Sequence, residues 1–329
     1  MSLLEVEDLA VSFARAGRRV RVLDGVTFSI EPGEILGVVG ESGSGKTVTA
    51  LALVRLLGEQ GMIERGRIVL AGRDLAALSA EEMTAARGRD LAMIFQEPMT
   101  SLNPLLKAGF QVAEVLMEHV GLGRAEAMSR AVALLDQVGI ADAARRAKAY
   151  PHQLSGGMRQ RVMIAMALAC KPKLLIADEP TTALDVTIQA QILGLLRELR
   201  DRTGAAILLI THDLGVIAET VDRVLVMYAG EIVEEAPVER LFAAPAHPYT
   251  RLLMRSIPSV DAKRPALEAI AGAPPSPLRF PGGCRFHPRC PLSTGRCADA
   301  SPPREPASGG GIVRCWRKAD VGQIEAIAS

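Results

Sequence analysis

The stretch that decides the fold is Glu34-Ile-Leu-Gly-Val-Val39, followed directly by Gly40-Glu-Ser-Gly-Ser-Gly-Lys46-Thr47. Its first six residues form a short apolar run of the kind that is buried on both faces of a parallel sheet. The next eight fit the pattern G-x-x-x-x-G-K-[S/T], a glycine-rich turn whose backbone N–H groups wrap phosphates. Residues 47–57 are largely apolar and predict a helix after the turn. The stretch therefore predicts a strand, a phosphate-binding loop and a helix.

The motif assigns a role to each part of the loop. The backbone N–H groups and the helix N-terminus would hold the phosphates of a nucleotide. Lys46 would reach the β- and γ-phosphates, and Thr47 would ligate Mg²⁺. The competing interpretation is a strand–helix turn with a solvated lysine. The candidate nucleotide-binding residues of the loop are Gly40, Glu41, Ser42, Gly43, Ser44, Gly45, Lys46 and Thr47.

A second apolar run, Leu174-Leu-Ile-Ala177, ends in two carboxylates, Asp178 and Glu179. A strand that ends in this way would place Asp178 beside Mg²⁺ and Glu179 where it could activate water for attack on the γ-phosphate. Alone, the pair could be two acids facing solvent. Together with the phosphate loop, it predicts a hydrolytic site.

The surrounding sequence alternates strand and helix patterns. Residues 206–210 predict another buried strand, and 186–202 predict an amphipathic helix that stops before Gly204. This alternation favours right-handed crossovers and a mainly parallel sheet. Residues 9–13 and 26–30 alternate apolar and polar side chains and suggest an antiparallel layer.

Two further segments, 108–117 and 125–138, have helical patterns with no strand pattern between them. They predict a helical insertion in the α/β domain.

The sequence Leu154-Ser155-Gly156-Gly157-Met158-Arg159-Gln160 opens a predicted helix at 158–169 and makes a second anion-binding turn. One nucleotide does not need two such turns from one chain, so a head-to-tail dimer is the economical explanation. With these motifs in order, residues 3–240 resemble an ATP-binding cassette (ABC) ATPase. The resemblance implies a P-loop NTPase fold of class α/β, with a RecA-like parallel-sheet core, an N-terminal antiparallel β layer and a helical subdomain at about 97–165.

The same resemblance implies roles for residues outside the three main motifs. Gln96 at the Q-loop would sense Mg²⁺ and water, and His212 would contact the γ-phosphate. Asp185 would lie at the dimer interface, and Phe13 would stack on adenine. The turn Ser155, Gly156 and Gly157 would close on the partner's ATP. Taken singly, these residues could equally be a surface glutamine, a strand-end histidine, a helix-capping aspartate and a core aromatic.

A narrower resemblance rests on Met93-Ile-Phe-Gln96-Glu-Pro-Met-Thr-Ser-Leu-Asn103-Pro104, on His247-Pro248-Tyr249-Thr250 and on the Pro/Cys-rich tail. These features look like the dipeptide/oligopeptide permease ATPases, a subfamily that also includes nickel and glutathione importers. The subfamily implies a second related ATPase subunit, two transmembrane permease subunits and an extracytoplasmic substrate-binding protein. Residues 96–117 would dock on the membrane subunits.

Composition limits the alternatives. The chain has 329 residues, 49% of them hydrophobic, and its 38 basic and 37 acidic side chains leave a net charge of +1. That balance disfavours a nucleic-acid partner, which would need excess Lys and Arg. There is no pattern of a secretory signal and no apolar run of the ~20 residues that cross a bilayer. We expect a peripheral protein on the cytoplasmic face of the inner membrane.

Thirteen of the twenty prolines follow residue 241, and four of the five cysteines are Cys284, Cys290, Cys297 and Cys315. The composition therefore predicts an ATPase domain at 1–240 and an extension at 241–329. Clustered thiols in a reducing compartment suggest a metal site. The spacing lacks the C-x₂-C pairs of zinc ribbons, and some peptide-permease ATPases carry a [4Fe–4S] cluster on a similar tail. Zinc and free buried thiols remain alternatives; Cys170 is expected in the core, and His287 is expected to cap a turn.

Three classes of function stay open. The first is an importer ATPase with ATP and Mg²⁺ as ligands, for peptides or alternatively for nickel or glutathione. The second is an exporter ATPase, against which the tail and the Q-loop sequence argue. The third is a non-transport ABC ATPase; the 58 positions from Gln96 to Leu154 leave no room for the long coiled coil of DNA-repair relatives.

Overall fold

The computed structural model describes residues 2–97, 101–182, 184–256 and 270–324. The chain divides into two compact units. The first comprises residues 1–3, 30–34 and 71–210, and the second comprises 4–29, 35–70 and 211–329. The boundary predicted at residue 241 stays a prediction. Within the described residues, no helix is long and apolar enough to span a membrane.

The second unit is built on a mixed sheet in the strand order β11-β12-β10-β9-β3. β3 (Ile35–Val39) is buried at all five positions and pairs in parallel with β9 (Arg223–Tyr228). The remaining pairs are antiparallel, between β9 and β10 (Glu231–Pro237) and between β12 (Ile312–Val313) and its neighbours β10 and β11 (Glu305–Pro306). The extension after residue 241 thus adds two short strands to this sheet.

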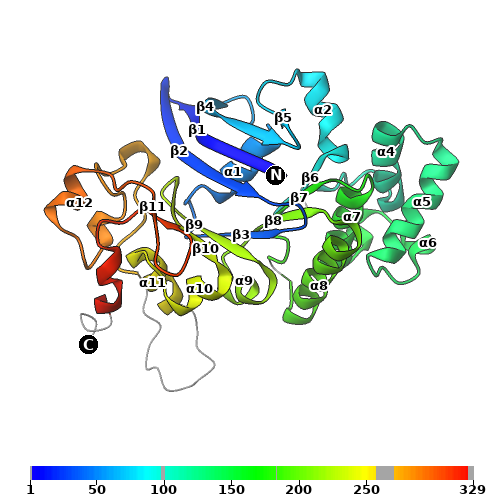
Figure 1. Ribbon diagram of the computed structural model, residues 1–329. Coiled ribbons are helices and arrows are strands. Elements are labelled where there is room, and N and C mark those ends of the chain that lie inside the picture. The colour runs from blue at the N-terminus through cyan, green and yellow to red at the C-terminus, as the bar shows by residue number, and fades with distance from the viewer. Residues whose placement is uncertain (1, 98–100, 183, 257–269, 325–329) are drawn as a thin grey trace. The chain divides into compact units, whose positions relative to one another are not determined.

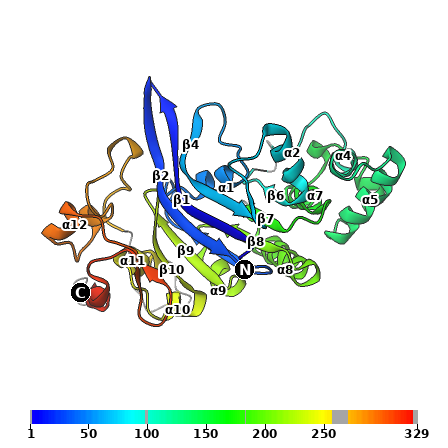
Figure 2. The ribbon, with the colours of Figure 1, turned by 45° about the horizontal axis from the view of Figure 1, so that its top comes forward.

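The same unit carries the predicted antiparallel layer, in the order β2-β1-β4. The expected strands at 9–13 and 26–30 are parts of longer strands, β1 (Leu4–Arg15) and β2 (Arg18–Ile30). β1 pairs with β4 (Gly61–Leu70) from Leu4 opposite Leu70 to Phe13 opposite Gly61. β1 and β2 form a long hairpin (Figure 2).

The helix after the phosphate loop, α1 (Lys46–Leu53), is shorter than the expected 47–57. Arg55 takes a left-handed conformation with φ 51°. The N–H groups of Leu56 and Arg55 then donate to the carbonyls of Leu51 and Ala52, an arrangement that closes the helix. The remaining helices of this unit are α9 (Leu214–Thr220), α10 (Val238–Ala243), α11 (Pro248–Arg255), α12 (Gly295–Asp299) and the 3₁₀ turns η2 (Pro277–Arg279), η3 (His287–Arg289) and η4 (Lys318–Gln323).

The first unit holds three parallel strands in the order β8-β7-β6. β7 (Leu174–Asp178) and β8 (Ala206–Ile210) are buried at every position, and β6 (Leu91–Ile94) lies at the edge. The connection from β7 to β8 is α8 (Val186–Thr203), which ends at Gly204 with φ 68°, as the sequence predicts. A short strand β5 (Arg73–Asp74) and α2 (Ala80–Arg89) precede β6.

Helices gather on one side of this unit (Figure 1). The predicted helices at 108–117 and 125–138 are α4 (Ala108–Val120) and α5 (Arg124–Gln137), and no strand lies between them. α6 (Ala143–Arg146) and the 3₁₀ turn η1 (Pro151–Gln153) follow. α7 (Gly156–Leu168) begins two residues earlier than the predicted 158–169, because Ser155 is its N-cap. The α/β fold expected from the sequence is therefore confirmed.

Candidate functional site

The phosphate loop lies in the second unit, between β3 and α1. Gly40 has φ 151°, and a Cβ on it would lie 2.2 Å from the carbonyl oxygen of Met227. Gly45 has φ 106°, and a Cβ there would lie 2.6 Å from Leu23 Cδ2. Both positions therefore require glycine. The path of the loop depends on its close contacts with the Met227 carbonyl of β9 and the Leu23 side chain of β2.

Lys46 is buried at the start of α1, and its Nζ donates to the carbonyls of Gly40 at 2.8 Å and Glu41 at 3.1 Å. Thr47 is exposed beside it. The Ser44 hydroxyl is buried without a hydrogen-bond partner among the described residues. The first N–H groups of a helix also have no carbonyl of their own. An orphaned hydroxyl, a helix N-terminus and a buried cation together fit a bound phosphate.

His212 belongs to the same unit and is exposed. Its neighbours fix its place: the N–H of Thr211 donates to the Val38 carbonyl at 3.2 Å, and Asp213 caps α9 through the N–H groups of Gly215 and Val216. His212 thus directly follows Thr211, whose N–H is bonded to β3 near the C-terminal end of that strand.

The first unit holds the carboxylate pair. Asp178 ends β7 and is 1% exposed, whereas Glu179 leaves the strand with φ 47°. The Glu179 N–H donates to the Ile210 carbonyl at 2.8 Å. Its Oε2 accepts from Gln96 Nε2 at 2.9 Å and from Thr182 Oγ1 at 2.8 Å. Two predicted site residues, Gln96 and Glu179, therefore lie in contact.

None of the sequence motifs includes Thr182. A hydroxyl three residues after the carboxylate, in the turn that follows β7, is the signal that could have indicated it. In the same region, positions 98–100 of the Q-loop segment and residue 183, which precedes Leu184 and Asp185, lie outside the described residues.

In the Ser-Gly-Gly turn at the start of α7, Ser155 and Gly156 are exposed and Gly157 is half-buried. Ser155 Oγ accepts from the Met158 N–H at 3.3 Å, and Gly156 and Gly157 form the first helical turn. Asp185 caps α8 by accepting from the Ile188 N–H at 2.9 Å. Its local role is therefore that of a helix cap, and its place at a dimer interface stays a prediction.

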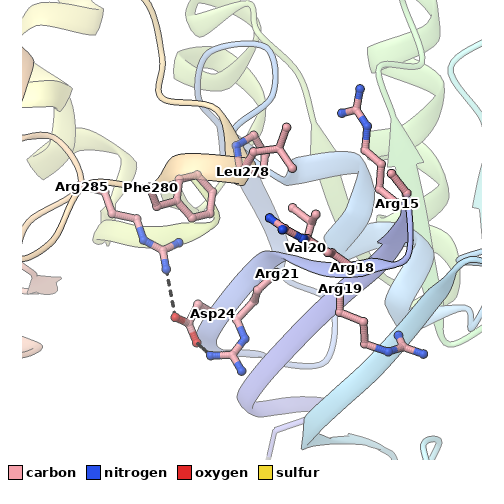
Figure 3. Close-up of a pocket in the computed structure, with 11 residues that line it drawn as sticks. Arg15, Arg18, Arg19, Val20, Arg21, Asp24, Leu278, Phe280 and Arg285 are labelled. Carbon is pink, nitrogen blue, oxygen red and sulfur yellow. Dashed lines mark hydrogen bonds and ion pairs between the residues drawn. The ribbon is translucent and has the colours of Figure 1, made fainter.

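Beside the phosphate loop, the β1–β2 hairpin and the extension line a pocket of about 740 Å³ (Figure 3). Arg285 anchors its wall by ion-pairing with Asp24 at 2.9 Å and donating to the Ala229 carbonyl at 2.6 Å. The next residue, Gly230, donates its N–H to the Ser44 carbonyl at 2.8 Å, so the pocket adjoins the loop. The lining residues include Arg15, Arg18, Arg19, Val20, Arg21, Leu278 and Phe280.

Phe13 is half-buried on β1 and pairs with Gly61 on β4. Phe13 is not one of the residues that line this pocket, so its stacking on adenine stays a prediction. The hairpin arginines Arg15, Arg18, Arg19 and Arg21 all line the pocket.

The four cysteines of the extension line one small cavity, together with His247, Phe286 and Trp316. Burial raises the pKa of Cys284, that of Cys290 to about 11 and that of Cys315 to about 12. The Arg317 N–H donates to Cys315 Sγ at 3.3 Å. Among the described residues, no group of three or more His, Cys, Asp or Glu is placed to hold a single metal ion.

Two expectations for single residues have different outcomes. Cys170 is not a core residue: it follows α7, is half-buried, and its Sγ lies 3.9 Å from the Val115 carbonyl oxygen. The helix ends at Leu168, which leaves Cys170 in the connection before β7. His287 begins the 3₁₀ turn η3, and its Nδ1 lies 3.0 Å from the Cys284 carbonyl oxygen.

The parallel strands, the glycine loop with buried Lys46 and the carboxylate pair define a P-loop nucleotide-binding protein. Residues 23–182 match the family model of the ABC transporter, and residues 233–297 match that of the oligopeptide/dipeptide transporter C-terminal region. A dimeric ATP-binding cassette in a post-hydrolysis state, bound to ADP and phosphate, is similar with a TM-score of 0.65 and 28% identity, over 71% of this chain and 98% of that one.

Curated relatives are similar over nearly their whole length. A probable peptide ABC transporter ATP-binding protein of Sinorhizobium fredii is 53% identical over 97% of this chain and 96% of its own length. The oligopeptide transport ATP-binding protein AppD of Bacillus subtilis is 51% identical over 96% of each. The dipeptide transport ATP-binding protein DppD of Escherichia coli is 47% identical over 97% and 98%. The chain belongs to the family of ATP-binding proteins of peptide ABC transporters, and it is an ABC ATPase.

Proposed function

We propose that this chain binds and hydrolyses ATP to power the uptake of dipeptides or oligopeptides across the cytoplasmic membrane. The observation that carries the proposal is the phosphate loop with Lys46 buried against its carbonyls. It occurs in a chain about half identical to proteins named for peptide transport. The assignment of residues 1–240 to the ATPase domain and 241–329 to the extension is part of the same proposal.

The loop residues, from Gly40 to Thr47, would hold the triphosphate. Lys46 would exchange the carbonyls of Gly40 and Glu41 for the β- and γ-phosphates, and Ser44 Oγ would gain a partner. Thr47, Gln96 and Asp178 would hold Mg²⁺, which neutralises phosphate charge when it is bound. The exposed Thr47 hydroxyl and the oxygen character of all three side chains suit this hard cation.

Glu179 would act as the general base. It would take a proton from a water whose oxygen attacks the γ-phosphorus, while the bond to the β–γ bridging oxygen breaks and ADP leaves. The hydrogen bonds from Gln96 and Thr182 hold the carboxylate in one orientation. Gln96 would orient the water, and His212 would contact the γ-phosphate.

The arginine-lined pocket would receive the base and ribose, with adenine stacked on Phe13. Arg15 and Arg18 have no side-chain partner among the described residues, so they are available to an anion. A pocket of about 740 Å³ falls in the usual range for small-molecule sites.

Ser155, Gly156 and Gly157 would close on the ATP of a second, related ATPase subunit, because their turn exposes a capped helix N-terminus. Two transmembrane permease subunits and an extracytoplasmic substrate-binding protein would complete the importer. The chain would lie at the cytoplasmic face of the inner membrane and contact the permeases through residues 96–117.

The cysteine cavity would bind a [4Fe–4S] cluster as a structural staple. Its support is the donor set: four thiols around one cavity suit a cluster in which each thiolate binds a different iron. Their raised pKa values keep the thiols protonated at neutral pH until a metal displaces the protons. Zinc is the second candidate, and unligated thiols are the third.

The test of the transport function is uptake of labelled dipeptide, longer peptide and Ni²⁺ in cells that carry the wild type or Glu179→Gln. Loss of peptide uptake in the variant is the expected result, with Glu198→Gln on the exposed side of α8 as the matched control. Loss of nickel uptake alone would show that the cargo is nickel and not a peptide. Unchanged uptake of all three would contradict an importer of these cargoes and favour another cargo or a non-transport ATPase.

A further inference from the structure

A residue of the extension contacts the phosphate loop directly. Arg289, at the end of η3, makes a two-point ion pair with Glu41: Nη1 to Oε2 at 2.7 Å and Nη2 to Oε1 at 3.0 Å. The Arg289 side chain is only 5% exposed, and that of Glu41 is 24% exposed. The two residues are 248 positions apart, and neither belongs to a pattern that predicts the contact.

A second residue of the extension, Tyr249, holds the backbone of Glu41. Its N–H donates to the hydroxyl of Tyr249 at 2.8 Å, and Tyr249 is fully buried. Arg289 Nη1 also donates to the hydroxyl of Tyr228 at 3.2 Å, and the rings of Tyr228 and Tyr249 lie 4.7 Å apart. The extension and β9 therefore hold both the main chain and the side chain of one loop residue.

Arg289 is itself fixed in place. Its Nε donates to the Ala271 carbonyl at 2.9 Å, and its Nη2 donates to the carbonyls of Ile270 at 3.2 Å and Gly272 at 3.3 Å. A planar guanidinium that uses this many donors has little freedom to move. Glu41 is thus bound to a rigid cation and not to a mobile surface side chain.

The ion pair affects both the position of Lys46 and the charge of the phosphate loop. The carbonyl of Glu41 accepts a hydrogen bond from Lys46 Nζ, so a shift of this peptide would move the lysine. Glu41 also places a carboxylate in a loop meant for a polyanion, and Arg289 neutralises it. Without the arginine, the loop would be looser and would repel phosphate.

We propose that Arg289 is a positioning residue for the phosphate loop, through which the C-terminal extension sets the affinity for ATP. The proposal rests on the assignment of this loop as the ATP site. Arg289 need not touch the nucleotide. It holds the Glu41 peptide in place and cancels the charge of its side chain.

The experiment measures binding of a fluorescent ATP analogue with Mg²⁺, together with KM and kcat for ATP, on the full chain assembled with its partner subunits. Arg289→Ala is expected to raise Kd and KM roughly tenfold, within the usual range of coupling between sites. We expect kcat at saturating ATP to change less than about threefold, because Gln96 and Glu179 are untouched. Arg289→Lys keeps the charge but loses the two-point geometry, so its Kd should lie between those of the wild type and Arg289→Ala.

The double variant Arg289→Ala/Glu41→Gln separates the two contributions. Removing the unpaired carboxylate should recover part of the lost affinity, a result that general loss of packing would not produce. The matched control is Arg304→Ala, because Arg304 belongs to the same extension and pairs with Glu235 at 3.1 Å, which is not a loop residue. Its Kd should equal that of the wild type.

Several outcomes would overturn the proposal. One is a Kd for Arg289→Ala and Arg289→Lys within twofold of the wild type, and another is an equal loss of affinity in Arg304→Ala. A wild type that binds no ATP, or binds it equally well after Lys46→Ala, would instead remove the assignment of the loop itself. The two failures are therefore distinguishable.

Discussion

At the scale of single residues, the chemistry depends on how a few polar groups are held. Glu179 is the clearest case, because its backbone is left-handed and its carboxylate accepts from Gln96 and Thr182. A non-glycine residue in that conformation is uncommon and is found where the surroundings enforce it. The hydrogen bond from its N–H to the Ile210 carbonyl and the two side-chain bonds supply that enforcement.

We expect Glu179→Gln to bind ATP with nearly unchanged affinity and to lower kcat about 10²–10⁴-fold, the usual contribution of a general base. The isosteric amide keeps the shape of the side chain but takes no proton. Steady-state hydrolysis and nucleotide binding measure the two effects, and the variant should accumulate an ATP-bound closed dimer. A kcat within threefold of the wild type would contradict the assignment of the base.

His247 predicts a pH dependence of stability. It is fully buried, its Nδ1 accepts from the Tyr249 N–H at 3.0 Å, and burial lowers its pKa to about 3 from the ordinary 6.5. Below pH 6.5 the unfolded chain therefore binds a proton that the folded chain does not. Stability should fall as the pH falls from 6.5 toward 3, by up to about 1.4 kcal/mol per pH unit from this group.

Denaturant unfolding between pH 6.5 and 5 measures this slope before most carboxylates titrate. His247→Asn is the matched variant, because an amide oxygen can still accept from the Tyr249 N–H and does not ionise. The free energy of unfolding of the variant should depend less on pH than that of the wild type. An identical slope in both chains would show that His247 does not titrate on unfolding.

At the scale of elements, helix starts determine where the candidate site residues lie. Ser155, Asp185 and Asp213 each cap the helix that follows by accepting from backbone N–H groups of its first turn. At α7 and α8 the cap is also a residue with a proposed function, so a local backbone requirement and that function coincide at Ser155 and Asp185, whereas Asp213 directly follows His212. Replacing such a residue changes both the stability of the helix and the proposed function, unless the new side chain still caps the helix.

Asp185 allows the two roles to be separated. Asp185→Ala should destabilise the fold by about 1 kcal/mol through loss of the cap on α8. Asp185→Asn should keep the cap and the stability, because an asparagine oxygen accepts equally well. If the carboxylate also acts at an ATPase dimer interface, Asp185→Asn should still weaken ATP-driven association, measured by sedimentation with ATP and Glu179→Gln. Normal association of Asp185→Asn would leave Asp185 as a cap alone.

At the scale of the whole molecule, the extension is not an independent appendage. It contributes β11 and β12 to the sheet of the second unit, a wall to the arginine-lined pocket and the cation that pairs with the phosphate loop. The cysteine cavity lies in the same segment, and Arg289 immediately precedes Cys290. Whatever stabilises the cysteine cavity should therefore also stabilise the arginine that reaches the loop.

We expect the chain purified without oxygen to contain iron and acid-labile sulfide in equal amounts, and Cys290→Ser to lose both. Loss of the cluster should lower the midpoint of thermal unfolding, because the extension would lose a covalent staple. The control is Cys170→Ser in the other unit, which should keep the metal. Zinc in place of iron would shift the assignment to the second candidate, and no metal in any preparation would contradict a metal site.

The sequence by itself determined the strand–loop–helix at the phosphate site, the carboxylate pair and the helices at α4, α5 and α8. These features depend on local spacing, apolar periodicity and residues such as Gly45 and Gly204 whose conformation has few alternatives. The predicted bounds of α1 and α7 were wrong, because the closing turn at Arg55 and the cap at Ser155 set the ends of these helices, and Cys170 was expected in the core but is half-buried.

Only the tertiary structure decided that Arg289 and Tyr249 hold Glu41, that Thr182 supports Glu179, and that hairpin arginines face Phe280 across a pocket. Local periodicity carries no information about which of many arginines meets which of many acids at a separation of 248 residues. That pairing follows from the sheet, which fixes where the extension returns to the loop. The local sequence therefore determined the residues of the phosphate loop, whereas tertiary packing determined which residues hold that loop in place.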